Sequence, residues 1–280
     1  MWFKMITLMQ YGLSIVSGII VGFSLGLIGG GGSILAVPLL LYFVGLSNMP
    51  NAAHIALGTT ALAVGLNAYV NSYMHLRKHN VGVKIGGIFA GVGLVGSLIG
   101  TYLGHITPGS SLLLYFSIAM IILGFYVGFK KNATKAGTHE EIPRINEAFN
   151  KCRNLTPKTI AIIGFFGFLV GLVSGYFGIG GGFLIVPALM FSASLCISRA
   201  IGTSLISVGT FGLASGLLYL HYGDTIVSIS LLYLLGGLLG GYFGTILAVK
   251  APKSTLQKAY GIIIVIVGIY MIFRVMHIGI

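Results

Sequence analysis

Apolar runs of about 20 residues recur from one end of this chain to the other, and they constrain its fold more than any other feature. A run of that length is what an α-helix needs to cross the hydrocarbon core of a bilayer. Only 7% of the residues are charged and the mean hydropathy is +1.00, whereas soluble domains carry about 25% charged residues. The sequence therefore predicts an all-α, polytopic integral membrane protein whose main partner is the lipid bilayer.

The positions of the basic residues indicate how the chain is oriented in the membrane and do not indicate a nucleic-acid-binding surface. The 16 Lys and Arg residues outnumber the 4 acidic ones, but they gather in short connections between apolar runs, as in membrane proteins that keep positive loops in the cytoplasm. We therefore expect no nucleic-acid partner. The two cysteines, Cys152 and Cys196, have neither the spacing of a disulfide framework nor that of a metal site. No metal and no cofactor are expected.

The sequence contains two copies of one pattern. When Pro38 is placed on Pro187, the glycine-rich stretches before them align. After a five-residue difference in the next loop, "LGTT" at 57–60 falls on "IGTS" at 201–204. Further matches pair Gly96 with Gly240, Gly100 with Gly244, Thr101 with Thr245, Pro108 with Pro252 and Gly124 with Gly268. Agreement over about a hundred residues in each half predicts a tandem duplication.

Each half contains a glycine-broken apolar pair followed by three uninterrupted transmembrane helices. The predicted pairs cover 8–28 with 33–46 and 159–177 with 183–196, and the predicted uninterrupted helices cover 52–75, 84–104, 110–129, 199–221, 226–248 and 254–275. The polar segment 130–158 separates the halves and holds three of the four acidic residues. We therefore divide the chain into a first repeat (1–129), a cytoplasmic linker (130–158) and a second repeat (159–280).

The charges favour two repeats that are inverted with respect to the membrane. If each broken pair enters the bilayer and returns, 14 of the 16 basic residues lie in the cytoplasm. If each pair crosses once, the repeats are parallel and only 12 do. Length agrees, because 159–192 as one helix would span roughly 50 Å, too long for an ordinary crossing. The prediction is a multi-pass protein of the cytoplasmic (inner) membrane with inverted repeats.

The two glycine-rich breaks, "GGGGS" at 29–33 and "GIGGG" at 178–182, are the predicted substrate site. Non-helical backbone at membrane depth survives only when it is buried in protein or lines a wet cavity, and matched breaks in two repeats are typical of transporter binding sites. Each break precedes an apolar helix, whose free N–H groups and positive dipole end attract anions. The candidate residues are Gly29, Gly30, Gly31, Gly32, Ser33, Gly178, Gly180, Gly181 and Gly182.

Close helix packing is the alternative explanation for the glycines. Glycines four residues apart let membrane helices touch, and we expect this role for Gly96/Gly100/Gly104, Gly167/Gly171/Gly175 and Gly236/Gly240/Gly244. Runs of adjacent glycines differ, because they cannot all face one neighbour. Pro38 and Pro187 lie too deep to be first-turn prolines, so kinks are expected at both.

The duplicated glycine-rich break, the apolar proline-containing helix after it and the following G-T-[ST] resemble the TauE/SafE sulfite exporter family over roughly 12–130 and 158–275. The resemblance implies a transporter of small anions, often sulfur-containing, such as sulfite, sulfonates or related organosulfur compounds. It does not fix which anion, because members of the family differ. The sequence also leaves the direction of transport open.

Polar residues on the helices after the breaks are further candidates. Thr59 and Thr60 match Thr203 and Ser204, and their hydroxyls could donate to an oxyanion or bond back to their own helix. Three other side chains are possible pathway residues with simpler alternatives. Asn67 and Asn71 share a helix face and could line a path or clasp a neighbouring helix, and Arg199 could meet an entering anion or anchor its helix.

Titratable groups inside the membrane are scarce in this sequence. Asp224 is the only acidic residue outside the linker and falls in a short loop, and His54, His75, His105 and His221 fall at predicted helix ends. Proton pumps usually embed a carboxylate or histidine relay in the membrane. With no buried carboxylate evident, the sequence predicts anion movement down an electrochemical gradient, without an acidic proton relay.

Other functional classes lack their characteristic residues. A cation channel or cation carrier would need acidic rings or buried carboxylates, and the sequence has no enzymatic motif such as H-E-x-x-H or G-x-S-x-G. We therefore predict no enzyme. A structural membrane protein with glycine-mediated helix packing is the remaining alternative, although it would not need two matched breaks.

Overall fold

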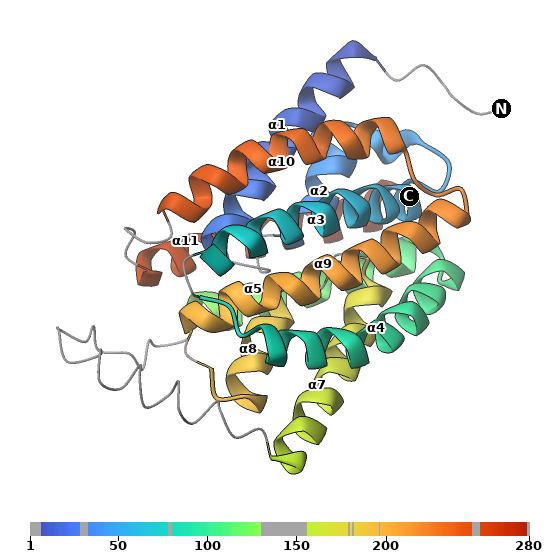
Figure 1. Cartoon of the computed structure of the whole chain (residues 1–280). Helices are drawn as coiled ribbons and strands as arrows, with labels where there is room; N and C mark the ends of the chain where they lie inside the picture. The colour runs from blue at the N-terminus through green and yellow to red at the C-terminus, as the bar shows by residue number, and fades with distance from the viewer. Residues whose placement is uncertain are drawn as a thin grey trace.

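The computed structural model describes residues 7–28, 33–77, 80–129, 156–178, 180, 182–195, 197–247 and 253–278, and all regular structure among them is helical. The elements are, in chain order, α1 (Leu8–Ile28), α2 (Ala36–Pro38), the π-helix η2 (Leu39–Phe43), the 3-10 helix η3 (Leu46–Asn48), α3 (Ala52–Arg77), α4 (Val83–Ile106), α5 (Gly109–Phe129), α7 (Pro157–Tyr176), α8 (Gly182–Ser192), α9 (Ile197–His221), α10 (Val227–Leu247) and α11 (Lys253–Ile278) (Figure 1). The predicted linker lies outside the described residues, and the repeat boundaries stay a prediction.

Six of the described helices are long and apolar enough to cross a membrane: α1, α3, α4, α7, α9 and α10. Shorter apolar helices lie at 33–43, 109–125 and 261–276. Large apolar side chains remain exposed along the outer helices, including Val95, Tyr102, Leu235, Leu239 and Phe243. In water such a surface would be unfavourable, whereas lipid solvates it. The chain is therefore a polytopic all-α membrane protein, as predicted.

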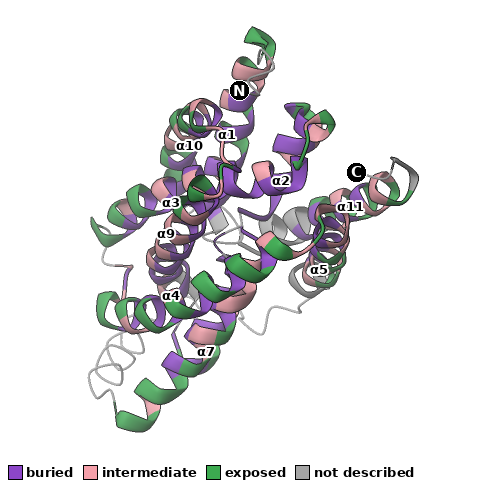
Figure 2. Cartoon of the chain, turned by 90° about the vertical axis from the view of Figure 1, so that its right-hand side faces the viewer, coloured by how far each residue is buried: buried purple, intermediate pink, exposed green. Residues whose placement is uncertain are grey.

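Helices from the two halves pack against one another in pairs. α1 lies along α10, α4 along α7, α3 along α9 and α5 along α11 (Figure 1). The α3–α9 pair is central and contacts both α4 and α10. Burial agrees, because 72% of the apolar window of α3 and 61% of that of α9 are buried, against 33% for α1 (Figure 2). A site between the halves is thus formed around α3 and α9.

The directions of the paired helices follow from which glycines meet which partners. In the α1–α10 pair Gly22 packs on Gly237 and Gly26 on Gly241, so these helices run parallel. The contacts Leu62 with Gly216 and Tyr69 with Gly209 make α3 and α9 antiparallel. α5 and α11 are antiparallel too, by the contacts of Ser117 with Gly268 and of Gly124 with Gly261. The duplication equates α3 with α9 and α5 with α11, and in both of these pairs the two helices run in opposite directions.

The glycines spaced four apart pack helices closely, which confirms that prediction. A Cβ on Gly100 would collide with the carbonyl oxygen of Leu172 on α7, and one on Gly175 with that of Ser97 on α4. Gly240 and Gly244, the equivalents of Gly96 and Gly100, lie against the backbone of α1. Because only glycine allows this approach, the two outer pairs are fixed at backbone contact distance.

The short helices after the two breaks differ where their prolines lie, because the regular α-helix ends at Pro38 and continues through Pro187. Pro38 ends α2, and the chain widens into the π-helix η2, whose first residue Leu39 accepts a hydrogen bond of 2.9 Å from Val44 N. Pro187 lies inside the 11-residue α8. Proline supplies no N–H for the helical ladder, so a departure from the α-helix at Pro38 is as expected.

Candidate functional site

The second glycine-rich break contains two buried glycines with left-handed backbone. α7 ends at Tyr176 and α8 begins at Gly182. Between them Gly178 has φ +58° and Gly180 has φ +66°, a region that residues with a Cβ rarely adopt. Both glycines are buried. The sequence therefore breaks the helix here because two positions, Gly178 and Gly180, need glycine.

This break lies against both central helices. A Cβ on Gly178 would lie 3.0 Å from the Leu57 side chain of α3, and one on Gly180 would lie 2.9 Å from Val208 of α9. Gly182 is buried at the start of α8, so the positive end of that helix dipole faces the break. The structure thus brings non-helical backbone and a helix N-terminus together inside the protein.

Part of the predicted site lies outside the described residues, namely Gly29, Gly30, Gly31, Gly32 and Gly181. Ser33, which ends the first break, is fully buried. Gly26, in the last turn of α1, packs against Gly241 and Thr245 of α10. The helix that precedes the first break, α1, thus packs along α10, and the helix that precedes the second break, α7, packs along α4.

Thr59 and Thr203 each hold a loop of the opposite half. Thr59 Oγ1 accepts a hydrogen bond of 3.0 Å from Ile226 N, which precedes α10, and Thr203 Oγ1 accepts one of 2.8 Å from Gly82 N, which precedes α4. Both threonines are at most 1% exposed. Sequence reasoning missed this role, although the equivalence of the two threonines and of the two loops in the duplication is the signal for it.

The hydroxyls next to these threonines bond back to their own helices. Thr60 Oγ1 donates to the carbonyl oxygen of Ala56 at 2.7 Å, and Ser204 Oγ donates to that of Ile201 at 2.7 Å. This arrangement corresponds to the back-bonding alternative. It leaves the hydroxyl oxygens, rather than their hydrogens, for any further contact.

The asparagine pair joins α3 to α10. Asn71 Nδ2 donates to Asn67 Oδ1 at 3.0 Å, and Asn71 Oδ1 accepts from Thr245 Oγ1 at 3.1 Å. A Cβ on Gly237 or Gly241 would press on these amides. Their contacts are those of the helix-clasping alternative. Arg199, the remaining pathway candidate, lies partly buried in the first turn of α9.

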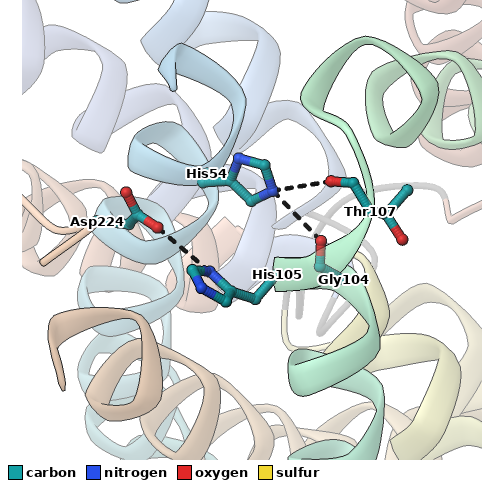
Figure 3. Close-up of polar contacts among 5 residues, drawn as sticks. All are labelled: His54, Gly104, His105, Thr107 and Asp224. Carbon is teal, nitrogen blue, oxygen red and sulfur yellow. Dashed lines mark hydrogen bonds and ion pairs between the residues drawn. The ribbon is translucent and has the colours of Figure 1, made fainter. Parts of the chain in front are cut away.

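A cluster of two histidines and an aspartate lies next to the second break, at the ends of α3 and α4 and in the loop before α10 (Figure 3). His105 Nδ1 lies 3.3 Å from Asp224 Oδ2. His54 Nε2 lies 3.3 Å from the carbonyl oxygen of Gly104 and 3.1 Å from that of Thr107. Asp224 is only 8% exposed.

This cluster corrects one of the sequence expectations. The expectation that no carboxylate is buried is wrong for Asp224, which is buried and pairs with His105. Burial raises the pKa of the Asp224 carboxyl, and the nearby His54 and His105 lower it. The sequence did not predict this burial because Asp224 lies in a loop. The residue is buried only because the ends of α3, α4 and α9 meet there.

No group of histidine, cysteine and acidic side chains within the described part of the chain has the arrangement of a metal site. In the cluster, His54 directs its Nε2 to backbone carbonyls rather than toward Asp224. The described residues thus offer a polar break and a titratable cluster side by side.

Comparisons with known proteins agree with this architecture. The family described as "Sulfite exporter TauE/SafE" matches residues 14–271. A probable membrane transporter protein of Xylella fastidiosa (strain 9a5c) is 42% identical over 265 residues, which cover 94% of this chain and 95% of that protein. The probable membrane transporter protein YdhB of Bacillus subtilis is 27% identical over 262 residues, covering 91% and 97%. No solved structure gives a significant match.

Proposed function

Because the chain belongs to the sulfite exporter TauE/SafE family, we propose that it is a transporter of small anions, sulfite, sulfonates or other organosulfur anions, which bind at the paired glycine-rich breaks. The family and the relatives indicate a membrane transporter rather than an enzyme. The observation that carries the binding site is the buried left-handed backbone at Gly178 and Gly180, directly before α8.

The chemistry of the break suits an oxyanion. The first turn of a helix presents N–H groups that have no partner within the helix, and the helix dipole adds partial positive charge there. Glycine allows a ligand to approach this backbone closely. The break also lies between α3 and α9, the two helices at the centre of the molecule. An anion bound here would contact both halves of the duplication.

The proposed topology places both repeats in the inner membrane with opposite orientations and the 130–158 linker in the cytoplasm. The antiparallel α3–α9 and α5–α11 pairs support it. In this orientation the ends of α3 and α4 that carry His54 and His105, and the loop with Asp224, face the extracytoplasmic side.

A ligand panel tests the substrate class. Purified protein is heated with sulfite, thiosulfate, an alkanesulfonate, sulfate or chloride, and the melting temperature is recorded. A ligand that binds only the native form stabilises it by mass action, by about 2.7 kcal/mol at a hundredfold excess over Kd. The melting temperature rises as a result. We expect at least one sulfur oxyanion to do so and chloride not to. No shift with any sulfur oxyanion would contradict the proposed substrate class.

A pair of glycine variants tests the site. Gly180→Ala adds left-handed strain and a methyl group at the break, so we expect loss of both the ligand-induced shift and anion flux into proteoliposomes. Gly45→Ala is the matched control, because Gly45 has φ +83° but lies in an exposed loop with open space around it. Normal ligand binding by a monodisperse Gly180→Ala variant would refute the site.

A further inference from the structure

Three titratable side chains from three elements converge where α3 begins and α4 ends. The ring centroids of His54 and His105 are 5.8 Å apart and edge-on, and His105 pairs with Asp224 (Figure 3). Accessibility is graded, because the His105 side chain is 31% exposed, that of Asp224 is 11% exposed and Tyr219 is fully buried. The cluster thus leads from solvent into the protein.

The hydrogen bonds define where protons can be added. His54 Nε2 faces two carbonyl oxygens, which only accept, so this nitrogen carries a hydrogen. His105 Nδ1 faces a carboxylate oxygen and likewise carries one while Asp224 is ionised. Each ring then has one further nitrogen that can take a proton. With both rings neutral the cluster has one negative charge, and one added proton cancels it.

The other half of the duplication has the same packing of a helix glycine on a loop carbonyl, but its loop residue has an uncharged side chain. Asn80 stands at the position equivalent to Asp224. The backbone of Gly202 packs on the Asn80 carbonyl as that of Gly58 packs on the Asp224 carbonyl. An amide is therefore sufficient at this position, and the carboxylate at Asp224 is not needed for packing.

The histidines are also confined to one half. By the same alignment Ser198 and Val249 stand at the positions of His54 and His105. An otherwise repeated architecture thus has the combination of one aspartate and two histidines at only one of its two equivalent ends. A buried charge is costly unless it is paired, so this asymmetry indicates a function for the cluster rather than a requirement of the fold.

The second break and the cluster are connected through the residues between them. Gly178 packs against Leu57, one helical turn after His54. Tyr176, the last residue of α7, has its hydroxyl 3.3 Å from the hydroxyl of Thr107, whose carbonyl faces His54 Nε2. The buried Tyr219 hydroxyl has no hydrogen-bond partner among the described residues and lies beside Gly104, which also contacts Tyr176. The Tyr219 hydroxyl is therefore a polar group between the cluster and the break that can form a further hydrogen bond.

We propose that His54, His105 and Asp224 form a proton-binding site coupled to the adjacent break, so that the protein moves a proton together with its anion. This inference rests on the proposed anion transport. An ionised Asp224 repels an anion that approaches the break, and a proton on the cluster removes that repulsion. By linkage, a bound anion must increase the proton affinity of the cluster by the same factor.

The electrostatic surroundings of the cluster come from every helix that packs on it. α7 contributes Tyr176, α9 contributes Tyr219 and His221, and Tyr222 follows in the loop with its ring stacked 3.9 Å from that of His105. The first turns of α5 and α10, "GSSL" and "VSIS", bring no titratable side chain. Among the residues that the structure describes, Asp224 is thus the single acidic group, and the imidazoles of His54 and His105 are the nearby bases.

Asp224 can be observed directly, because it is the only aspartate of the chain. Protein labelled at the aspartate side-chain carboxyl carbon is titrated by NMR, with Asp224→Asn identifying the resonance. We expect the Asp224 resonance to show a titration step as the cluster takes up its proton, and this step to move in His105→Gln, which removes one of the two bases. His221→Gln, an exposed histidine at the same end, is the matched control and should leave the step unchanged.

The coupling is tested by adding the anion that gives the largest melting-temperature shift in the panel. The step should move to higher pH, and in proteoliposomes with a lumenal pH dye, Asp224→Asn should reduce the stimulation of flux by a pH gradient about tenfold. A resonance that does not titrate, or a step that a binding anion leaves unmoved, overturns the proton site while the anion site stands. If no anion binds, the titration of Asp224 is unaffected, and it is the proposed function that fails.

Discussion

Asp224 carries a carboxyl group at a position where an isolated charge would be unfavourable. Burial raises its pKa, and the two imidazoles partly oppose that effect. A raised pKa in the folded state means that the stabilisation is fully present below the unfolded value of about 3.9 and is lost as pH rises through the folded pKa. The free energy of unfolding therefore depends on pH through this side chain.

Asp224→Asn removes this titration. We expect the melting temperature of the wild type, minus that of the variant, to fall steadily as the pH is raised from about 4. Thermal unfolding in detergent across a pH series measures the difference. A difference that rises with pH would mean that pairing with His54 and His105 outweighs the cost of burial.

Individual residues show what the sequence could and could not predict. The left-handed glycines of the second break follow from the sequence, because a glycine-rich stretch between apolar helices indicates a backbone that other residues rarely adopt. The role of Thr59 as acceptor for Ile226 N does not follow, because the partner lies 167 positions away. Asp224 was missed for the same reason: its burial depends on helices that are distant in sequence.

At the scale of the helix, crossing pairs depend on single glycines. Gly100 of α4 lies against the Leu172 carbonyl of α7, and Gly91 of the same helix faces open space. Gly100→Ala must push α7 away, so we expect a large fall in melting temperature or loss of monodisperse protein. Gly91→Ala meets nothing and should be tolerated, since alanine favours a helix by about 1 kcal/mol over glycine. Equal behaviour of the two variants in size-exclusion and melting experiments would contradict the packing role.

Helix positions were predictable because each spanning segment is long, apolar and bounded by glycine, proline or charged residues. The predicted run 199–221 ends where α9 ends, and 84–104 lies within α4. The sequence predicted that the helix would be irregular at Pro38, but not that the irregularity would be a π-helix. A missing N–H can be accommodated by a kink, a 3-10 turn or a wider turn, and packing of the neighbouring helices decides among them.

At the scale of the molecule, the duplication produces equivalent polar contacts on both sides of the central pair. Asn71 of α3 accepts from Thr245 of α10, and at the equivalent positions Ser215 of α9 meets Thr101 of α4, with hydroxyl oxygens 2.7 Å apart. Which helix of one half packs on which helix of the other was not contained in the sequence pattern. Periodicity within a helix identifies its buried face but not its partner.

The relative orientation of the two halves gives a further prediction. Val83 and Val227 are equivalent positions, each the first residue of its helix, α4 and α10, and 55% and 42% exposed. Inverted repeats place these two residues on opposite sides of the membrane, whereas parallel repeats place them on the same side. Single cysteines are introduced at each position after Cys152 and Cys196 have been replaced by serine.

Intact cells are then treated with a membrane-impermeant maleimide. We expect Val227→Cys to be labelled from outside and Val83→Cys only after the cells are opened, because the basic residues beside Val83, Arg77 and Lys84, favour the cytoplasm. Labelling of both from the same side would require α3 and α9 to run in the same direction. Their antiparallel contacts in the core rule that out, so such a result would overturn the arrangement of the whole bundle.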